Sequence, residues 1–99
     1  QVTVTGNLFS NQKGSDEHID INSVTDVIVQ DNIFLNTPAN GDGTSAFIVV
    51  KDSNGDSDGI TGSERVTLRR NIFLGWAGSV GHGFIQVGED GAGFFEARE

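Results

Sequence analysis

Oxygen-bearing side chains recur at alternate positions in the stretch DSNGDSDGITGSE, which runs from Asp52 to Glu64. A glycine and an isoleucine follow the last aspartate of this alternation. Carboxylate and amide oxygens are the ligands that Ca²⁺ prefers, and a glycine permits the sharp turn that brings alternate side chains to one cation. The sequence therefore predicts a calcium loop with the ligands Asp52, Asn54, Asp56, Asp58 and Glu64.

The same stretch also departs from the usual calcium loop. If Asn54 is the first position, Arg65 takes the twelfth, where an acidic ligand is usual, and Glu64 falls one place early. An asparagine at the first position also removes one negative charge. The alternative is a solvated loop whose Asp, Asn and Ser side chains make local turns. Both interpretations stay open.

The charge balance narrows the classes of partner. Fourteen acidic residues against six basic ones give a net charge of −8 over 99 residues. Such a surface repels phosphate backbones and anionic lipid, so we expect no nucleic-acid partner and no membrane partner. The chain has no cysteine, which excludes disulfides and thiolate metal sites. Fourteen glycines and a single proline favour a turn-rich β protein.

A repeat organises the chain and must position these residues. The segments VTVTGNLFSN, VIVQDNIFLN and VTLRRNIFLG each read apolar-x-apolar-x-x-Asn-apolar-Phe. Their asparagines are Asn7, Asn32 and Asn71. Stacked asparagines can share amide hydrogen bonds in a ladder, and the phenylalanines that follow can stack inside. The repeat therefore predicts successive coils of a solenoid.

A second set of short apolar segments lies between these repeats: HIDIN from His18, FIVVK from Phe47 and FIQVG from Phe84. Aligned on their isoleucines, they bury two aliphatic columns if side chains alternate across the strand. The opposite register would bury Asp20. The chosen register predicts an outward strip of aromatic and polar groups that could bind sugar, unless a loop or partner covers it. The residues predicted to bind carbohydrate are His18, Asp20, Phe47, Phe84 and Gln86.

Two polar, glycine-rich insertions, residues 37–45 and 51–64, account for the unequal repeat spacing. They predict a single segment, residues 1–99, with coils at about 1–25, 26–64 and 65–99. Three coils leave strand edges and apolar core open at both ends. We therefore expect a homo-oligomer or a segment of a longer solenoid.

The repeats resemble the right-handed parallel β-helix of the pectate-lyase-like superfamily. The likeness implies polysaccharide as the ligand class and an extracellular or periplasmic location. It is carried by Asn7-Leu8-Phe9, Asn32-Ile33-Phe34 and Asn71-Ile72-Phe73, with the valines that precede them.

The resemblance also implies two enzymatic alternatives. A polysaccharide lyase needs a cation that neutralises a uronate carboxylate and a base that removes a proton. Gly81-His82-Gly83 is similar to a strand start of polygalacturonase-type hydrolases, but the paired aspartates of those enzymes are missing. A charge pair between Arg70 and Asp31 on neighbouring coils is a simpler interpretation than lyase chemistry. The basic groups available to a calcium-assisted lyase are Lys51, Arg65, Arg69 and Arg70.

Taken together, these patterns predict an all-β, right-handed parallel β-helix of about three coils with open ends. The favoured function is a non-enzymatic scaffold or carbohydrate-binding segment, with calcium as its candidate ion. A carbohydrate-active enzyme is the alternative. It is less favoured because no catalytic carboxylate pair or nucleophile motif accompanies the repeats.

Overall fold

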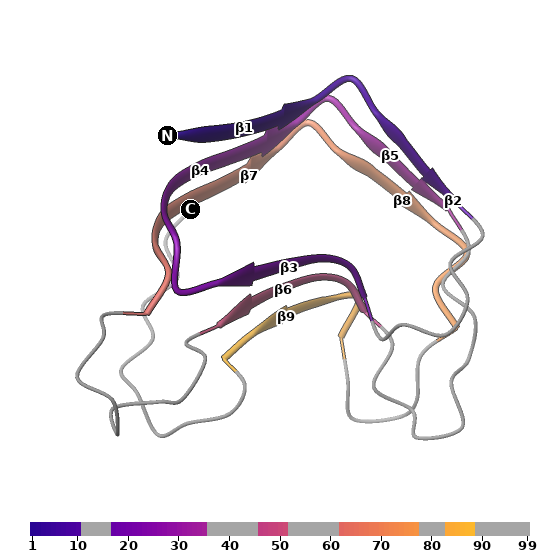
Figure 1. The fold of residues 1–99 in the computed structure, drawn as a ribbon. Helices are drawn as coiled ribbons and strands as arrows, with labels where there is room; N and C mark the ends of the chain where they lie inside the picture. The colour runs from indigo at the N-terminus through magenta and orange to yellow at the C-terminus, as the bar shows by residue number, and fades with distance from the viewer. Residues whose placement is uncertain (11–16, 36–45, 52–61, 78–82, 89–99) are drawn as a thin grey trace.

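The computed structural model describes residues 1–10, 17–35, 46–51, 62–77 and 83–88. Within these ranges the chain forms nine strands and no helix, joined in three parallel sheets that surround a common interior (Figure 1). This confirms the all-β prediction and is consistent with a β-solenoid. The first sheet consists of β1 (Val2–Thr5), β4 (Thr25–Gln30) and β7 (Glu64–Arg69); the second of β2 (Leu8–Ser10), β5 (Ile33–Leu35) and β8 (Ile72–Leu74); the third of β3 (Glu17–Asn22), β6 (Ala46–Lys51) and β9 (Ile85–Val87).

Strand pairing in the first two sheets follows the predicted repeat. Val2 pairs with Val27 and Val27 with Val66, although their separations along the chain differ. In the second sheet the phenylalanines pair in the same order, Phe9 with Phe34 and Phe34 with Phe73. Equivalent residues therefore lie directly above one another, as the stacking of coils requires.

The third sheet has the predicted register and shows where one insertion begins and ends. Ile48 pairs with Ile19 on one side and with Ile85 on the other. Lys51 ends β6 and Glu64 begins β7, so the insertion predicted at 51–64 is one residue too wide at each end. Residues 37–45 and 52–61 lie outside the described residues.

The core is centred on the middle coil, whose strands β4, β5 and β6 pair on both sides with other described strands. Val27 is 3% exposed and Phe47 is 0% exposed. Their counterparts on the outer coils, Val2 and Phe84, are each 46% exposed. The buried apolar side chains among the described residues are Ile21 of the first coil and, in the middle coil, Val27, Val29, Phe34, Ala46, Phe47, Ile48 and Val49.

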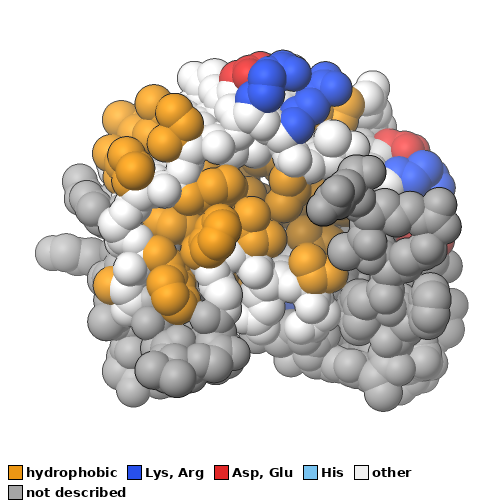
Figure 2. Space-filling view, turned by 180° about the vertical axis from the view of Figure 1, so that it is seen from behind, with side chains coloured by type: hydrophobic (Ala, Val, Ile, Leu, Met, Phe, Trp, Pro, Cys, Tyr) orange, Lys and Arg blue, Asp and Glu red, His pale blue; other side chains and the backbone are white. Residues whose placement is uncertain are grey.

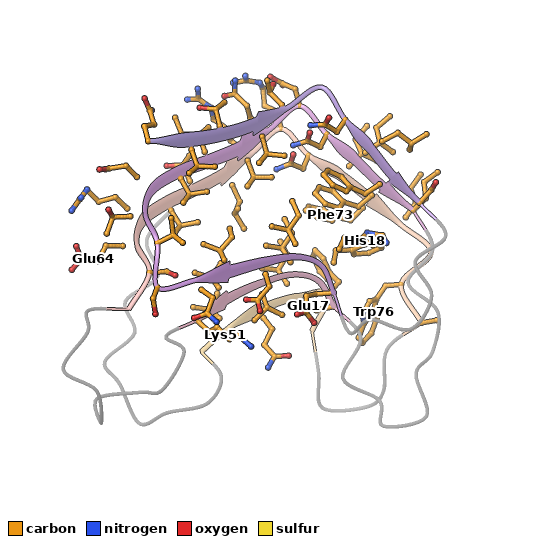
Figure 3. All side chains as sticks on the ribbon, viewed as in Figure 1. Glu17, His18, Lys51, Glu64, Phe73 and Trp76 are labelled. Carbon is orange, nitrogen blue, oxygen red and sulfur yellow. The ribbon has the colours of Figure 1, made fainter. Side chains whose placement is uncertain are left out.

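One predicted orientation is wrong. Simple alternation placed His18, Phe47 and Phe84 on the outer face, but Phe47 is buried beside Ile48 in the core. His18 lies inside the ring of strands near Phe73, as Figure 3 shows. The alternation fails because these residues lie at the corner where the chain enters the third sheet, and there two successive side chains turn inward. Burial of an aromatic ring favours this conformation by roughly 2 kcal/mol or more.

Candidate functional site

The asparagine ladder contains the one buried polar residue among those that the structure describes. Asn32 is 1% exposed. Its Oδ1 accepts hydrogen bonds from the backbone N–H of Asn7 at 2.9 Å and from Asn7 Nδ2 at 3.1 Å. Its Nδ2 donates to the carbonyl of Val4 at 3.0 Å and to Asn71 Oδ1 at 3.1 Å. The predicted ladder is thus present, and it satisfies the backbone where the chain turns between sheets.

The backbone around the ladder repeats the same pattern from coil to coil. The N–H of Ile33 donates to the carbonyl of Asn7, and the N–H of Ile72 donates to that of Asn32, both at 2.9 Å. Asn71 Nδ2 donates to the carbonyl of Val29 at 2.9 Å. Every one of these bonds runs between neighbouring coils, so the ladder fixes the register of the stack.

The corner before the ladder uses a left-handed backbone conformation. Gly6 has φ of 70°, Asp31 of 56° and Arg70 of 52°. This region favours glycine, and a side chain in it costs about 1 kcal/mol. Asp31 and Arg70 occupy the column in which the first coil has Gly6, so their conformation could be inferred only by comparing coils and not from the local residue type.

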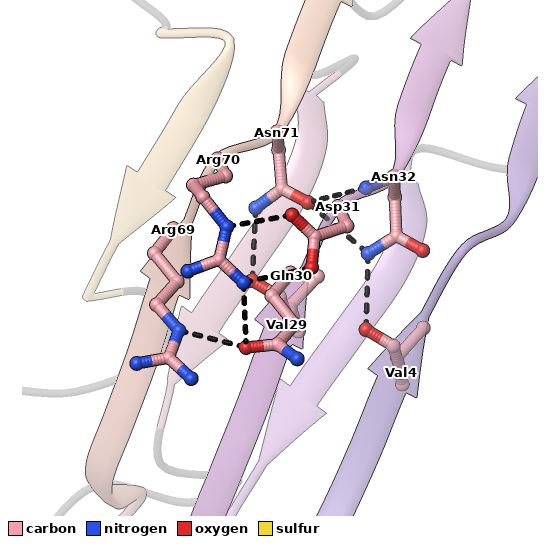
Figure 4. A network of polar contacts seen from close by, with 8 residues as sticks. All are labelled: Val4, Val29, Gln30, Asp31, Asn32, Arg69, Arg70 and Asn71. Carbon is pink, nitrogen blue, oxygen red and sulfur yellow. Dashed lines mark hydrogen bonds and ion pairs between the residues drawn. The ribbon is translucent and has the colours of Figure 1, made fainter.

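A charge pair joins these two corner residues. Arg70 Nε donates to Asp31 Oδ1 at 2.7 Å and Arg70 Nη2 donates to Asp31 Oδ2 at 2.8 Å (Figure 4). The hydrogen bonds from the guanidinium lower the pKa of Asp31, and the carboxylate raises the pKa of Arg70. The predicted cross-coil pair is confirmed. Its exposure to solvent makes it a weak contribution to stability.

Two further arginines of the third coil bond to the coil beneath. Arg65 Nε donates to Asp26 Oδ1 at 2.6 Å and Arg65 Nη2 to Asp26 Oδ2 at 3.1 Å. Arg69 Nε donates to Gln30 Oε1 at 2.7 Å. The side-chain hydrogen bond with Asp26 raises the pKa of Arg65 and lowers that of Asp26. These side chains link coils in the same way as the ladder does.

An aromatic cluster fills the corner between the second and third sheets. The ring centroids of Phe9 and Phe34 lie 4.8 Å apart, and those of Phe34 and Phe73 lie 5.0 Å apart, with nearly parallel planes. Phe47 packs edge-on against Phe34 at 6.0 Å, and Phe84 lies 5.4 Å from Phe73. The rings predicted to meet a sugar therefore contact the internal phenylalanine stack, and Phe47 has no exposed surface to offer a ligand.

His18 belongs to this cluster on the first coil. Its ring lies 6.2 Å from Phe9, 6.0 Å from Phe34 and 5.4 Å from Phe47. Neither ring nitrogen reaches solvent or has a hydrogen-bond partner among the residues described. Burial lowers the pKa of His18, so the neutral imidazole is favoured.

The outer face of the third sheet carries the remaining residues of the predicted sugar site. Asp20 is exposed, and its Oδ2 lies 3.4 Å from Lys51 Nζ. Gln86 pairs with Val49, which is only 2% exposed. Figure 3 shows Lys51 and Glu17 projecting from this face, away from the interior. The structure thus separates Asp20 and Gln86 from the aromatic residues predicted to accompany them.

The sequence analysis missed the hydroxyl of Ser63, which links three backbone groups at the corner just before β7. Ser63 Oγ lies 2.8 Å from the carbonyl of Lys51 and 3.0 Å from that of Ile21, to which its single hydrogen can donate. The same oxygen accepts a hydrogen bond from the backbone N–H of Val24 at 3.3 Å. No repeat of Ser63 appears in the other coils, so no pattern pointed to it.

Most of the predicted calcium loop lies outside the described residues, including Asp52, Asn54, Asp56 and Asp58. Glu64 is described: it begins β7, and its Oε2 accepts a hydrogen bond from Arg65 Nη1 at 3.2 Å. Among the described residues, no group of three or more His, Cys, Asp or Glu side chains could hold a metal ion. The calcium loop stays a prediction.

Comparison with models of known protein families, with curated protein sequences and with solved structures found no match for this chain. None of the described residues forms a helix long and apolar enough to span a lipid bilayer.

Proposed function

We propose that the chain is a segment of a right-handed parallel β-helix that serves as a non-enzymatic scaffold. Right-handed crossovers between parallel strands of one sheet are the strong general preference, which supports this hand. The observation that best supports the scaffold function is the engagement of Asn32, whose buried amide makes all of its hydrogen bonds within the stack. This amide is used to hold coils together.

Arg65 and Arg70 also bond to the neighbouring coil, which supports the scaffold function and weighs against the lyase alternative. A lyase base must accept a proton, so it must be able to exist unprotonated. Asp26 raises the pKa of Arg65 and Asp31 raises that of Arg70, which makes both poorer proton acceptors than free arginine. Arg69 differs from these two arginines, because its Nε donates at 2.7 Å to the neutral amide of Gln30 and not to a carboxylate.

Location and ion content follow only from the resemblance and from the loop sequence. The proposal places the scaffold outside the cytoplasm, extracellular or periplasmic, where polysaccharides are the expected neighbours. Calcium bound by the loop between β6 and β7 would stabilise the longest connection of the middle coil.

A turnover and retention experiment tests the scaffold function. The protein is incubated with pectin, alginate and a glycosaminoglycan, with calcium present, and ultraviolet absorbance is followed for an unsaturated product. Retention on the same polysaccharides is measured by affinity electrophoresis. We expect neither product nor retardation. A product that disappears in Arg69→Ala or Lys51→Ala would replace the scaffold with a lyase.

Retention without turnover would instead indicate a carbohydrate-binding segment. Phe84→Ala is the informative variant for that outcome, because Phe84 is 46% exposed whereas Phe47 is 0% exposed. Retardation that is lost in Phe84→Ala, with the circular dichroism spectrum unchanged, would show that a ring at the open end binds sugar.

A further inference from the structure

The two ends of the stack carry opposite hydrogen-bonding groups at the asparagine ladder. In the middle coil, the backbone N–H of Asn32 donates to Asn71 Oδ1 at 3.1 Å. The equivalent N–H of Asn71 has no acceptor among the described residues, because no described coil follows β8. At the other end, Asn7 Oδ1 accepts no hydrogen bond from any described residue. One end therefore offers a donor and the other an acceptor.

The neighbouring groups extend this asymmetry. Asn32 Nδ2 donates to the carbonyl of Val4, and Asn71 Nδ2 donates to that of Val29, in each case one coil back. Val29 pairs with Leu68, so the Leu68 carbonyl is the next acceptor in this series. By the same repetition, the N–H of Leu8 points away from β5, as the N–H of Ile33 points to the carbonyl of Asn7.

The apolar surfaces at the two ends also match. Val2 is 46% exposed at one end, although its pairing partner Val27 on the middle coil is 3% exposed. Val87 is 51% exposed at the other end, and its partner Val50 on the middle coil is partly buried against the core. Figure 2, which looks onto the β7–β8–β9 end, shows apolar side chains gathered in the centre of that face, with arginines at its edge. The stacked Phe9, Phe34 and Phe73 rings would continue in register if a further coil followed.

We propose that the β7–β8–β9 end of one copy of this chain binds the β1–β2–β3 end of a second copy. Asn7 Oδ1 of the second copy would accept from the N–H and Nδ2 of Asn71. Asn7 Nδ2, which donates to the Thr5 carbonyl at 3.0 Å and to Asn32 Oδ1 at 3.1 Å within one copy, would exchange the Thr5 carbonyl for the Leu68 carbonyl across the contact. The N–H of Leu8 of the second copy would donate to the Asn71 carbonyl. This inference rests on the scaffold function proposed above and names its partner.

A second copy fits because the contact repeats the one that already joins the coils of a single chain. The identical spacing of Asn and Phe on all three coils lets one register satisfy the ladder, the strands and the ring stack together. Two like ends cannot do this, because the strands of the two copies would then run in opposite directions, and neither the parallel pairing nor the asparagine ladder would repeat across the contact. A head-to-tail contact of this kind does not close on itself, and it generates a filament.

Two blocking variants test both the contact and its direction. Val2→Lys places a charge at the β1–β2–β3 end and Val87→Lys at the β7–β8–β9 end, each at a half-exposed position. We expect the unaltered protein to form species larger than a dimer as its concentration rises in sedimentation velocity. Each variant alone should remain a monomer, because every contact it could make contains the lysine. An equimolar mixture should form a dimer, through the one unblocked end of each variant.

Ile72→Lys is the matched control. Ile72 is 52% exposed on the second sheet, in the column of Leu8 and Ile33, whose members are also exposed. Its position is lateral to the stacking direction, so this variant should assemble as the unaltered protein does. Leu8→Pro provides a second block at the β1–β2–β3 end if Val2→Lys loses its circular dichroism signal, since it removes the outward N–H and adds no charge.

Several outcomes would overturn the proposal. The unaltered protein could stay monomeric at every concentration. Ile72→Lys could abolish assembly. The mixture of the two blocking variants, both folded, could stay monomeric. Deletion of residues 89–99 that turns a monomeric protein into an assembling one would also overturn it for the full chain, because the chain would then cover its own end. None of these results bears on the scaffold function, which is tested by turnover and retention.

Discussion

Asn32 Nδ2 and Asn71 Oδ1 are joined by a hydrogen bond of 3.1 Å although 39 residues separate them in the chain. Asn7 and Asn32, only 25 residues apart, are joined by the same bond at the same distance. The longer connection has therefore left the geometry of the ladder unchanged. This is the property expected of a solenoid, in which insertions extend loops while neighbouring coils stay in contact.

Removing the amide of Asn32 should cost more than removing that of Asn7. Asn32→Ala deletes four hydrogen bonds in a buried place and leaves the Asn7 N–H and the Val4 carbonyl unpaired. We expect a loss of about 3 kcal/mol in the free energy of unfolding. Asn7→Ala, at an exposed end, should cost about 1 kcal/mol. Urea unfolding followed by circular dichroism measures both, and equal losses would contradict the role of the middle rung.

Truncation of Phe47 should likewise lower the free energy of unfolding more than truncation of Phe84. Phe47 is 0% exposed and packs against Phe34 and Phe73. Phe47→Ala should therefore lower the free energy of unfolding by about 4 kcal/mol. Phe84→Ala, at a position that is 46% exposed, should cost about half as much. A Phe47→Ala protein of unchanged stability would mean that this ring does not lie in the core.

The residues that align from coil to coil show what the sequence predicts well. The columns Val2, Val27 and Val66, and the asparagines and phenylalanines after them, could be aligned because stacking places the same residue type in the same environment on every coil. Periodicity between coils is therefore a stronger signal here than periodicity along a strand.

The errors lie where the chain departs from regular strand geometry. Alternation of side chains holds inside a strand, but it fails at the corner that His18 and Phe47 occupy, and no local residue type marks that corner. The left-handed conformations of Asp31 and Arg70 were equally hidden, because the usual glycine is present only on the first coil, at Gly6. Ser63 acts in a single corner, so no repeat could reveal it.

The left-handed backbone conformation at Arg70 predicts that a glycine variant is more stable than an alanine variant, which is the reverse of the usual order. Its φ of 52° favours glycine over residues with a Cβ. Arg70→Gly should therefore be more stable than Arg70→Ala by about 1 kcal/mol, since both lose the same exposed pair with Asp31. The matched control is Arg69, a strand residue, where Gly should be the less stable of the two substitutions. Thermal unfolding of the four variants gives the comparison, and the same order at both positions would contradict the corner geometry.

The calcium prediction is tested by a melt with chelator followed by addition of calcium. Binding to the folded state alone raises stability by about 2.7 kcal/mol at a hundredfold excess over Kd. We expect an upward shift of Tm that disappears in the double variant Asp56→Ala and Asp58→Ala. Glu64→Gln should reduce the shift if this residue, whose carboxylate accepts from Arg65 at 3.2 Å, also contributes a ligand. No shift at millimolar calcium would establish the solvated loop instead.

Stability should fall in mild acid because of His18. Burial lowers the pKa of its imidazole below the ordinary value of 6.5, so the unfolded chain binds a proton more readily than the folded one. The stability that His18 contributes is fully present above about pH 6.5 and is lost as the pH falls from that value through the lower pKa of the folded state. Asp26 and Asp31 titrate in a separate window, since their pKa values are lowered from 3.8 and their contribution is lost below about that pH.

His18→Phe isolates this effect, because a phenylalanine matches the Phe47 and Phe84 of the other coils. Urea unfolding at pH 7.5 and at about pH 5.5 should show a smaller pH dependence in the variant than in the unaltered protein. His82, present in both, cancels from the difference. An unchanged pH dependence between these values would show that the His18 ring is protonated as easily in the folded state as in the unfolded chain. Its two ring nitrogens would then need a partner or solvent that the aromatic cluster does not provide.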